Sequence, residues 1–128
     1  MPMKAMIAAV VIASCSAVAA PALAHHSAAA FDRSKLLTLN GTIKEFRFAN
    51  PHSWIYLEVT SEQGQAELWS LEGGSISILS RNGWTSHSLN VGDRVTVTAH
   101  PRKDENLSGA FEAVTLSDGT TLGFNPLY

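Results

Sequence analysis

The sequence has few of the residues that crosslink small secreted proteins or bind nucleic acid. It contains one cysteine among 128 residues, Cys15, so no disulfide can form within the chain. Nine lysines and arginines stand against eleven aspartates and glutamates, a formal net charge of −2, without any basic cluster. Nucleic-acid-binding surfaces usually carry a stripe of positive charge. These absences exclude a disulfide scaffold and argue against DNA or RNA as a partner.

The motifs of common enzyme classes are also missing. The chain contains no GxSxG turn, no HExxH helix and no glycine-rich phosphate loop that carries a lysine. Its carboxylates are scattered singly along the chain, which is typical of a solvated surface. The sequence therefore predicts a binding protein and not an enzyme. A copper-dependent redox activity is the one catalytic alternative that its histidines leave open.

The amino-terminal end is typical of a secreted bacterial protein. Residues 1–24 combine a short basic region at Lys4, an apolar run and the small-residue cleavage site "ALA" that ends at Ala24. The run is short for the ~20 apolar residues that a membrane-spanning helix needs. We therefore expect a cleaved signal peptide, a periplasmic protein and no membrane span. The segment "IASC" offers an alternative, a lipoprotein anchored to the membrane through Cys15.

The rest of the chain is predicted to be a flexible segment, residues 25–35, followed by one β-domain, residues 36–128. Apolar and polar residues alternate with period two, which indicates half-buried strands. Strands are predicted in "LLTLNGTIKEFRF", "SWIYLEV", "AELWSLE", "RVTVTAH", "AFEAVTL" and "TLGF". Between the third and fourth of these strands, Ser75 can cap a short helix, "ISILSRN", which Gly83 would end.

This order of elements is that of the OB-fold, a five-stranded barrel. We therefore predict an all-β fold, an OB-like five-stranded barrel with one short helix, and keep an antiparallel β-sandwich as the alternative. The barrel is favoured because a long first strand with a bulge or bend at Gly41 can pair at both ends. In the second strand, Ile55, Leu57 and Val59 should face the core. In "RVTVTAH", Val95, Val97 and Ala99 alternate with polar residues, and Val97 should be buried.

Several motifs are similar to those of one secreted bacterial family. They are "AHHS…FD" after the leader, "NPHSWIYLEV" in the middle, "GW…SL…GD" before the fourth strand and "VTL.DG..L" near the end. Over essentially the whole mature chain they resemble the family called domain of unknown function 6152. The resemblance implies a secreted, single β-rich domain and brings no established activity. The matching positions are His25, His26, Ser27, Phe31, Asp32, Asn50, Pro51, His52, Trp84 and Gly92.

Histidines form the first candidate site. Cleavage after Ala24 would make His25 the first residue, and its free amine and ring Nδ1 could chelate copper. His26 offers another ring, and His52, in the loop between the first two strands, is the expected further ligand. His100 begins the loop between the last two barrel strands, which lies nearby in OB barrels. We predict a site for copper or another divalent transition metal at His25 and His52, assisted by His26 or His100.

A structural interpretation of the same histidines stays open. His25 and His26 are also consistent with a flexible terminus that binds nothing. His52 is also consistent with a residue that stabilises its own turn by a hydrogen bond to a backbone carbonyl beside Pro51.

Aromatic residues form the second candidate site. Trp54 and Tyr56 should share the outward face of the second strand, and Asn50 in the preceding turn is included as a candidate ligand-binding residue. Two neighbouring exposed rings can stack on a sugar, a peptide or a partner protein. The alternative function is therefore an adaptor that docks a periplasmic protein or glycan. In the structural alternative, the segment "AAAFD" folds back and Phe31 packs on this pair.

Overall fold

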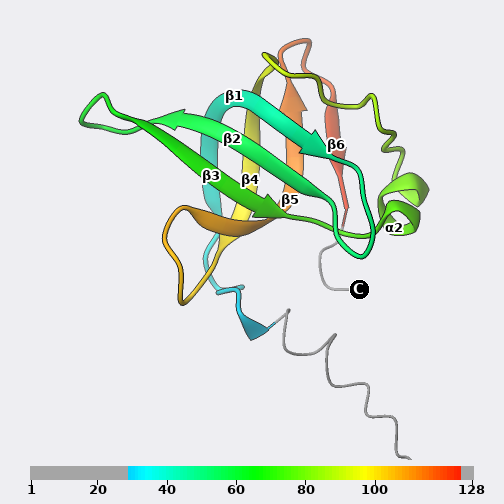
Figure 1. The fold of residues 1–128 in the computed structure, drawn as a ribbon, viewed down its shortest axis with the longest axis horizontal. Helices are drawn as coiled ribbons and strands as arrows, with labels where there is room; N and C mark the ends of the chain where they lie inside the picture. Colours follow the sequence, from blue (N-terminus) through cyan, green and yellow to red (C-terminus); the bar gives the residue numbers. More distant parts are fainter. Residues whose placement is uncertain (1–28, 125–128) are drawn as a thin grey trace, which may run out of the picture.

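The fold is that of a computed structural model, which describes residues 29–124. One six-stranded sheet wraps around a single core (Figure 1). In chain order its elements are β1 (Leu37–Arg47), β2 (Trp54–Thr60), β3 (Ala66–Glu72), α2 (Ile76–Arg81), β4 (Arg94–Pro101), β5 (Ser108–Leu116) and β6 (Thr121–Gly123).

The sheet closes into a barrel. Neighbouring strands follow the order β3-β2-β1-β4-β5, and β5 also pairs with β3 in parallel, while the other pairs are antiparallel. The parallel pair joins Ser70–Glu72 to Ser108–Ala110. Strand β6 adds a short edge to β5. The predicted all-β, OB-like barrel with one short helix is confirmed, and residues 29–124 do not form the two packed sheets of the alternative.

Closure depends on β1, whose first half pairs with β4 and whose second half pairs with β2. The prediction that this strand pairs at both ends is confirmed. Its register shifts between Ile43 and Glu45, so the bulge lies at Lys44, whereas a bulge or bend was predicted at Gly41. Gly41 has another role: a Cβ at this position would overlap the backbone carbonyl of Glu58, because β2 approaches closely.

Alternate residues of the strands fill the core. Ile55 and Leu57 of β2 and Val97 and Ala99 of β4 have no exposed surface, and Val59 is half-buried. The inward faces of both strands are therefore those predicted from the period-two pattern. Each fully buried Ile, Leu or Val side chain contributes roughly 1.5–3 kcal/mol relative to an exposed one.

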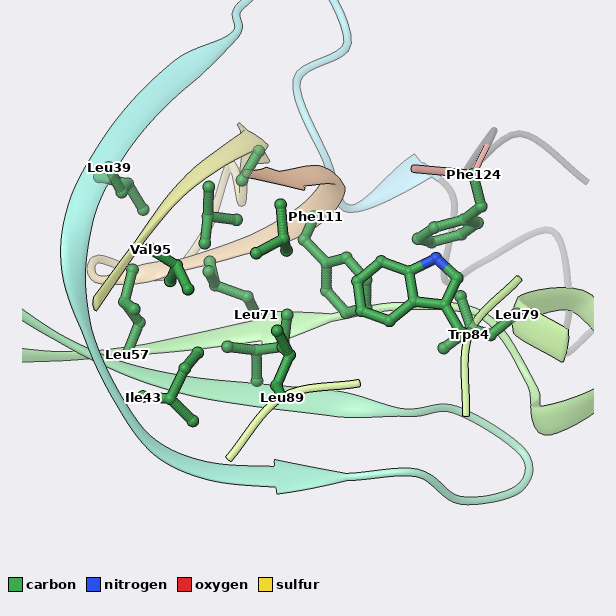
Figure 2. Close-up of a cluster of buried hydrophobic side chains, with 14 residues drawn as sticks. Leu39, Ile43, Leu57, Leu71, Leu79, Trp84, Leu89, Val95, Phe111 and Phe124 are labelled. Atoms are coloured by element: carbon green, nitrogen blue, oxygen red, sulfur yellow. The ribbon is translucent and has the colours of Figure 1, made fainter. Parts of the chain in front are cut away.

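An aromatic group fills the end of the core nearest the helix. The ring centroid of Phe111 lies 5.5 Å from that of Trp84 and 5.2 Å from that of Phe124 (Figure 2). The Trp84 indole Nε1–H donates to the carbonyl of Gly123 at 3.2 Å. A Cβ on Gly73 would overlap the Phe111 ring. The chain just after β3 is therefore packed directly against this group.

Helix α2 follows this segment and begins where predicted. The Ser75 hydroxyl accepts the N–H of Ile78 at 3.3 Å, and Leu79 is buried in the core. Gly83, after the helix, has φ +86°, a left-handed conformation that glycine adopts without the steric cost of a Cβ. In the described part of the chain, no helix is long and apolar enough to cross a membrane.

Candidate functional site

The loop between β1 and β2 is attached to the segment after β3. Ser53 is fully buried, its N–H donates to the carbonyl of Gly74, and its own carbonyl accepts the N–H of Gly73, both at 2.8 Å. The loop contains the motif "NPHS" and its partner segment reads "EGGS". These bonds bring the side chain of His52 to the end of β3.

Asn50, a predicted ligand-binding residue, makes a structural contact through one of its side-chain atoms. Its Oδ1 accepts the N–H of Ile76, the first residue of α2, at 3.0 Å. The first N–H groups of a helix have no partner within the helix, so this bond satisfies one of them. The peptide bond between Asn50 and Pro51 is cis.

His52 is held through Nδ1, which lies 3.2 Å from the carbonyl oxygen of Gly73 and 3.3 Å from Oε1 of Glu72. A carbonyl oxygen can only accept, so Nδ1 carries the hydrogen, and in the neutral ring Nε2 keeps its lone pair. The side chain of His52 is 42% exposed and that of Glu72 is 11% exposed. The backbone bond suggested by the structural interpretation is present, but its acceptor comes from the segment after β3 and not from the turn beside Pro51.

His100 lies at the end of β4 and has different partners. Its Nδ1 lies 2.8 Å from the carbonyl oxygen of Lys35, and its Nε2 lies 3.7 Å from Oε2 of Glu112. The ring therefore links β4 to the segment before β1 and to β5.

Of the predicted metal ligands, His52 and His100 lie within the described residues. His25 and His26 lie outside the described residues. Within residues 29–124, no three side chains of His, Cys, Asp or Glu come close enough to hold a metal ion. Neither His52 nor His100 therefore belongs to a group of three candidate ligands from this part of the chain.

Trp54 and Tyr56 point outward from β2, as predicted. Their ring centroids are 6.5 Å apart and their planes differ by 20°. The guanidinium carbon of Arg47, on β1, lies 5.0 Å from the Tyr56 ring centroid, and a hydrogen bond to Glu45 raises the pKa of this arginine. Both rings are half-buried rather than fully exposed. In the described part of the chain, Phe31 makes no ring contact with either of them.

Phe31 instead lies against the β4–β5 loop. It forms a β-bridge with Arg102, whose guanidinium carbon lies 5.9 Å from the ring centroid, and the neighbouring Asp32 N–H donates to the carbonyl of Pro101 at 2.8 Å. Phe31 is 8% exposed. Residues 29–35, the described part of the segment predicted to be flexible, are therefore attached to the barrel. They are called the strap below and meet the β4–β5 loop in Figure 1.

Arg102 contacts the strap and carries a charge that interacts with Glu72, a neighbour of His52. Its Nε donates to Asp104 at 2.7 Å and lies 3.4 Å from Glu105. The hydrogen bond to Asp104 is the main cause of a raised pKa for Arg102, and the negative charge of Glu72 contributes to it. Glu72, which contacts His52, is thus close enough to Arg102 for their charges to interact.

Glu72 and Arg47 were not identified from the sequence. They are the cross-strand neighbours of Trp54 on β3 and β1. The only signal for Glu72 is its position before two glycines, since the third strand shows no clean alternation.

Residues 12–111 match the family described as "Family of unknown function (DUF6152)". No curated protein and no solved structure gives a significant match to the chain. The matched region covers most of the 128 residues and includes both the "NPHS" loop and the "EGGS" segment that together hold His52. The chain therefore belongs to this family of unknown function.

Proposed function

We propose that this protein is a small periplasmic binding module that recognises a glycan through the outer face of β2. The observation that supports this function is the pair of nearly parallel rings, Trp54 and Tyr56, on the side of an OB-like barrel. In OB-folds the face of the second and third strands binds oligonucleotides and oligosaccharides. The net charge of −2 and the lack of a basic cluster argue against an oligonucleotide, which leaves the saccharide.

The surroundings of the aromatic pair suit a sugar. A sugar ring has an apolar C–H face that packs on an aromatic ring, and hydroxyls at its edge that need hydrogen-bond partners. The cross-strand neighbours of the pair are polar: Arg47 and Glu45 on β1, and Glu72 and Ser70 on β3.

The same face is poorly suited to a stable protein interface. Such an interface buries roughly 800 Å² on each partner, around an apolar centre. Beyond the two half-buried rings, the exposed large apolar side chain on this face is Leu68. A glycan of a few sugar units is therefore favoured over a docked protein.

The test is a glycan array followed by calorimetry with the best-bound oligosaccharide. Trp54→Ala removes one stacking surface and should weaken binding about tenfold, roughly 1.4 kcal/mol. Trp54→Phe keeps a ring and should retain most of the affinity. Unchanged binding by Trp54→Ala would refute the proposal, and capture of a periplasmic protein without glycan binding would favour the adaptor instead.

Copper binding is a second candidate function, favoured by the hydrogen-bonding state of His52. A metal-ligating histidine usually donates its other ring N–H to a carbonyl or carboxylate, and the Gly73 carbonyl and the Glu72 carboxylate both lie beside Nδ1.

Copper titration of the mature protein tests this second function. His52→Ala and an alanine inserted before His25 should each weaken Cu(II) binding by tenfold or more, while His87→Ala serves as the matched control. Affinity should fall from about pH 8 to pH 5, because the amine and imidazoles must lose protons to coordinate. His52→Ala also loses its bond to the Gly73 carbonyl, so melting curves of the metal-free variants are needed. Equal copper affinity in His52→Ala and the wild type would exclude His52 as a ligand.

A further inference from the structure

A polar hollow lies on the outer surface of the barrel, beside the aromatic pair. Its volume is about 640 Å³, within the range of roughly 300–1,000 Å³ that small-ligand sites occupy. The polar side chains that matter for its chemistry come from β1, β2 and β4 and from the residue after β5. They are Asn40, Thr42, Glu58, Thr60, Arg94, Thr96 and Ser117.

The hollow continues the row of side chains that carries the aromatic pair. Alternate residues of a strand face the same side, so Trp54, Tyr56, Glu58 and Thr60 form one outward row on β2. The first two are the rings, and the last two line the hollow. At 3.2–3.4 Å per residue the row is ~20 Å long. An oligosaccharide that stacks on the rings can therefore extend into the hollow.

The hollow offers hydrogen-bonding groups that the protein itself leaves unused. In the described chain, the hydroxyls of Thr42, Thr60 and Ser117 have no hydrogen-bond partner. The Thr96 hydroxyl donates to Oδ1 of Asn40 at 2.7 Å, which leaves the two amide hydrogens of Asn40 for a ligand. This set of donors and acceptors suits a ligand rich in hydroxyls.

The lining of the hollow carries one carboxylate and one guanidinium, and the two differ in their partners. Glu58, its lining carboxylate, is paired with Lys44 at 3.5 Å. The guanidinium of Arg94 has no ion pair or hydrogen bond within residues 29–124. Arginine binds planar anionic groups through two parallel N–H donors, which makes a carboxylate or sulfate the natural partner of this side chain.

We propose that the hollow selects acidic oligosaccharides. One or two sugar units stack on Trp54 and Tyr56, and a following unit lies in the hollow with its anionic substituent on Arg94. Asn40 and Thr42 bind the hydroxyls of that unit. This inference rests on the proposed glycan-binding function and specifies the class of glycan.

The experiment compares oligosaccharides of the same length that differ only in charge. The probes are an oligouronide, its methyl ester and a sulfated oligosaccharide, titrated into the full-length mature protein. Wild type should bind the oligouronide or the sulfated probe at least tenfold more tightly than the neutral ester. Comparing the two acidic probes identifies which anionic group Arg94 prefers. The preference should weaken with added salt, because the charges are exposed.

Variants separate this inference from the function on which it rests. Arg94→Gln should abolish the preference for the acidic probes over the ester, while Arg33→Gln, an equal change in charge on the strap, should preserve that preference. Trp54→Ala should weaken all probes alike. Equal affinity of wild type for acid and ester would overturn the inference but leave glycan binding intact. If no probe is bound by wild type, both proposals are wrong.

Discussion

Gly73→Ala should destabilise the barrel at the joint between its core and the His52 loop. Residue 73 is buried, and an added Cβ would overlap the ring of Phe111. The ring has little room to move, because Trp84 and Phe124 pack on it at 5.5 and 5.2 Å. Inserting a methyl group into such a core costs about 1–3 kcal/mol. In a domain of this size each kcal/mol lowers the melting temperature by about 4–8 °C.

The assay is thermal unfolding followed by circular dichroism, with matched variants. A Cβ on Gly123 would meet only ordinary contacts, the nearest being the carbonyl oxygen of Glu112 at 3.4 Å, so Gly123→Ala should melt close to wild type. Phe111→Leu destabilises by itself but should reduce the cost of Gly73→Ala when the two are combined, which a double-mutant cycle measures. Wild-type melting of Gly73→Ala would refute the packing of Phe111 against this segment. It would also refute the position of the carbonyl that holds His52.

Three further predictions test the strands, the helix and the response to acid. Val97→Asp should abolish cooperative unfolding, because an unpaired buried carboxylate costs several kcal/mol, whereas Thr96→Asp on the outward face should melt near wild type; equal melting would contradict the alternation of β4. Asn50→Ala should cost about 1 kcal/mol by leaving the first N–H of α2 without its acceptor, and an unchanged melting temperature would show that this bond contributes nothing. A hydrogen bond from the Thr120 backbone N–H lowers the pKa of Asp118 below 3.8, so the ionised carboxylate stabilises the fold above that pH and this contribution is lost on further acidification. In Asp118→Asn, the melting temperature should therefore fall less steeply below about pH 4 than in wild type. An equal fall in both proteins would contradict the lowered pKa.

Strands with one buried face could be predicted because the signal is local. In β2 and β4 every second residue is apolar, and Ile55 and Val97 are fully buried as expected. The position of the β1 bulge was not predicted, for the opposite reason. It depends on the register of β1 with two partner strands, and nothing in the sequence around Gly41 or Lys44 encodes that register.

The candidate site shows the same division between local and long-range information. The outward direction of Trp54 and Tyr56 follows from their parity with buried neighbours on one strand. The partners of His52 could not be predicted in this way, because Glu72 lies on another strand and Gly73 lies in the turn that follows it. The contact of Asn50 with α2 could not be predicted either, because its partner, Ile76, lies 26 positions further along the chain.

The sequence by itself determined the class of fold, the inward faces of β2 and β4, the start of α2 and the membership of a family. Each of these depends on residues within a few positions of one another, where periodicity, capping and motif spacing are visible. Only the tertiary structure decided which side chains meet. Asn40 and Thr96, for example, are hydrogen-bonded across two strands although 56 positions separate them. Such contacts depend on strand register and barrel closure, which arise from the simultaneous burial of many side chains and not from any single stretch of sequence.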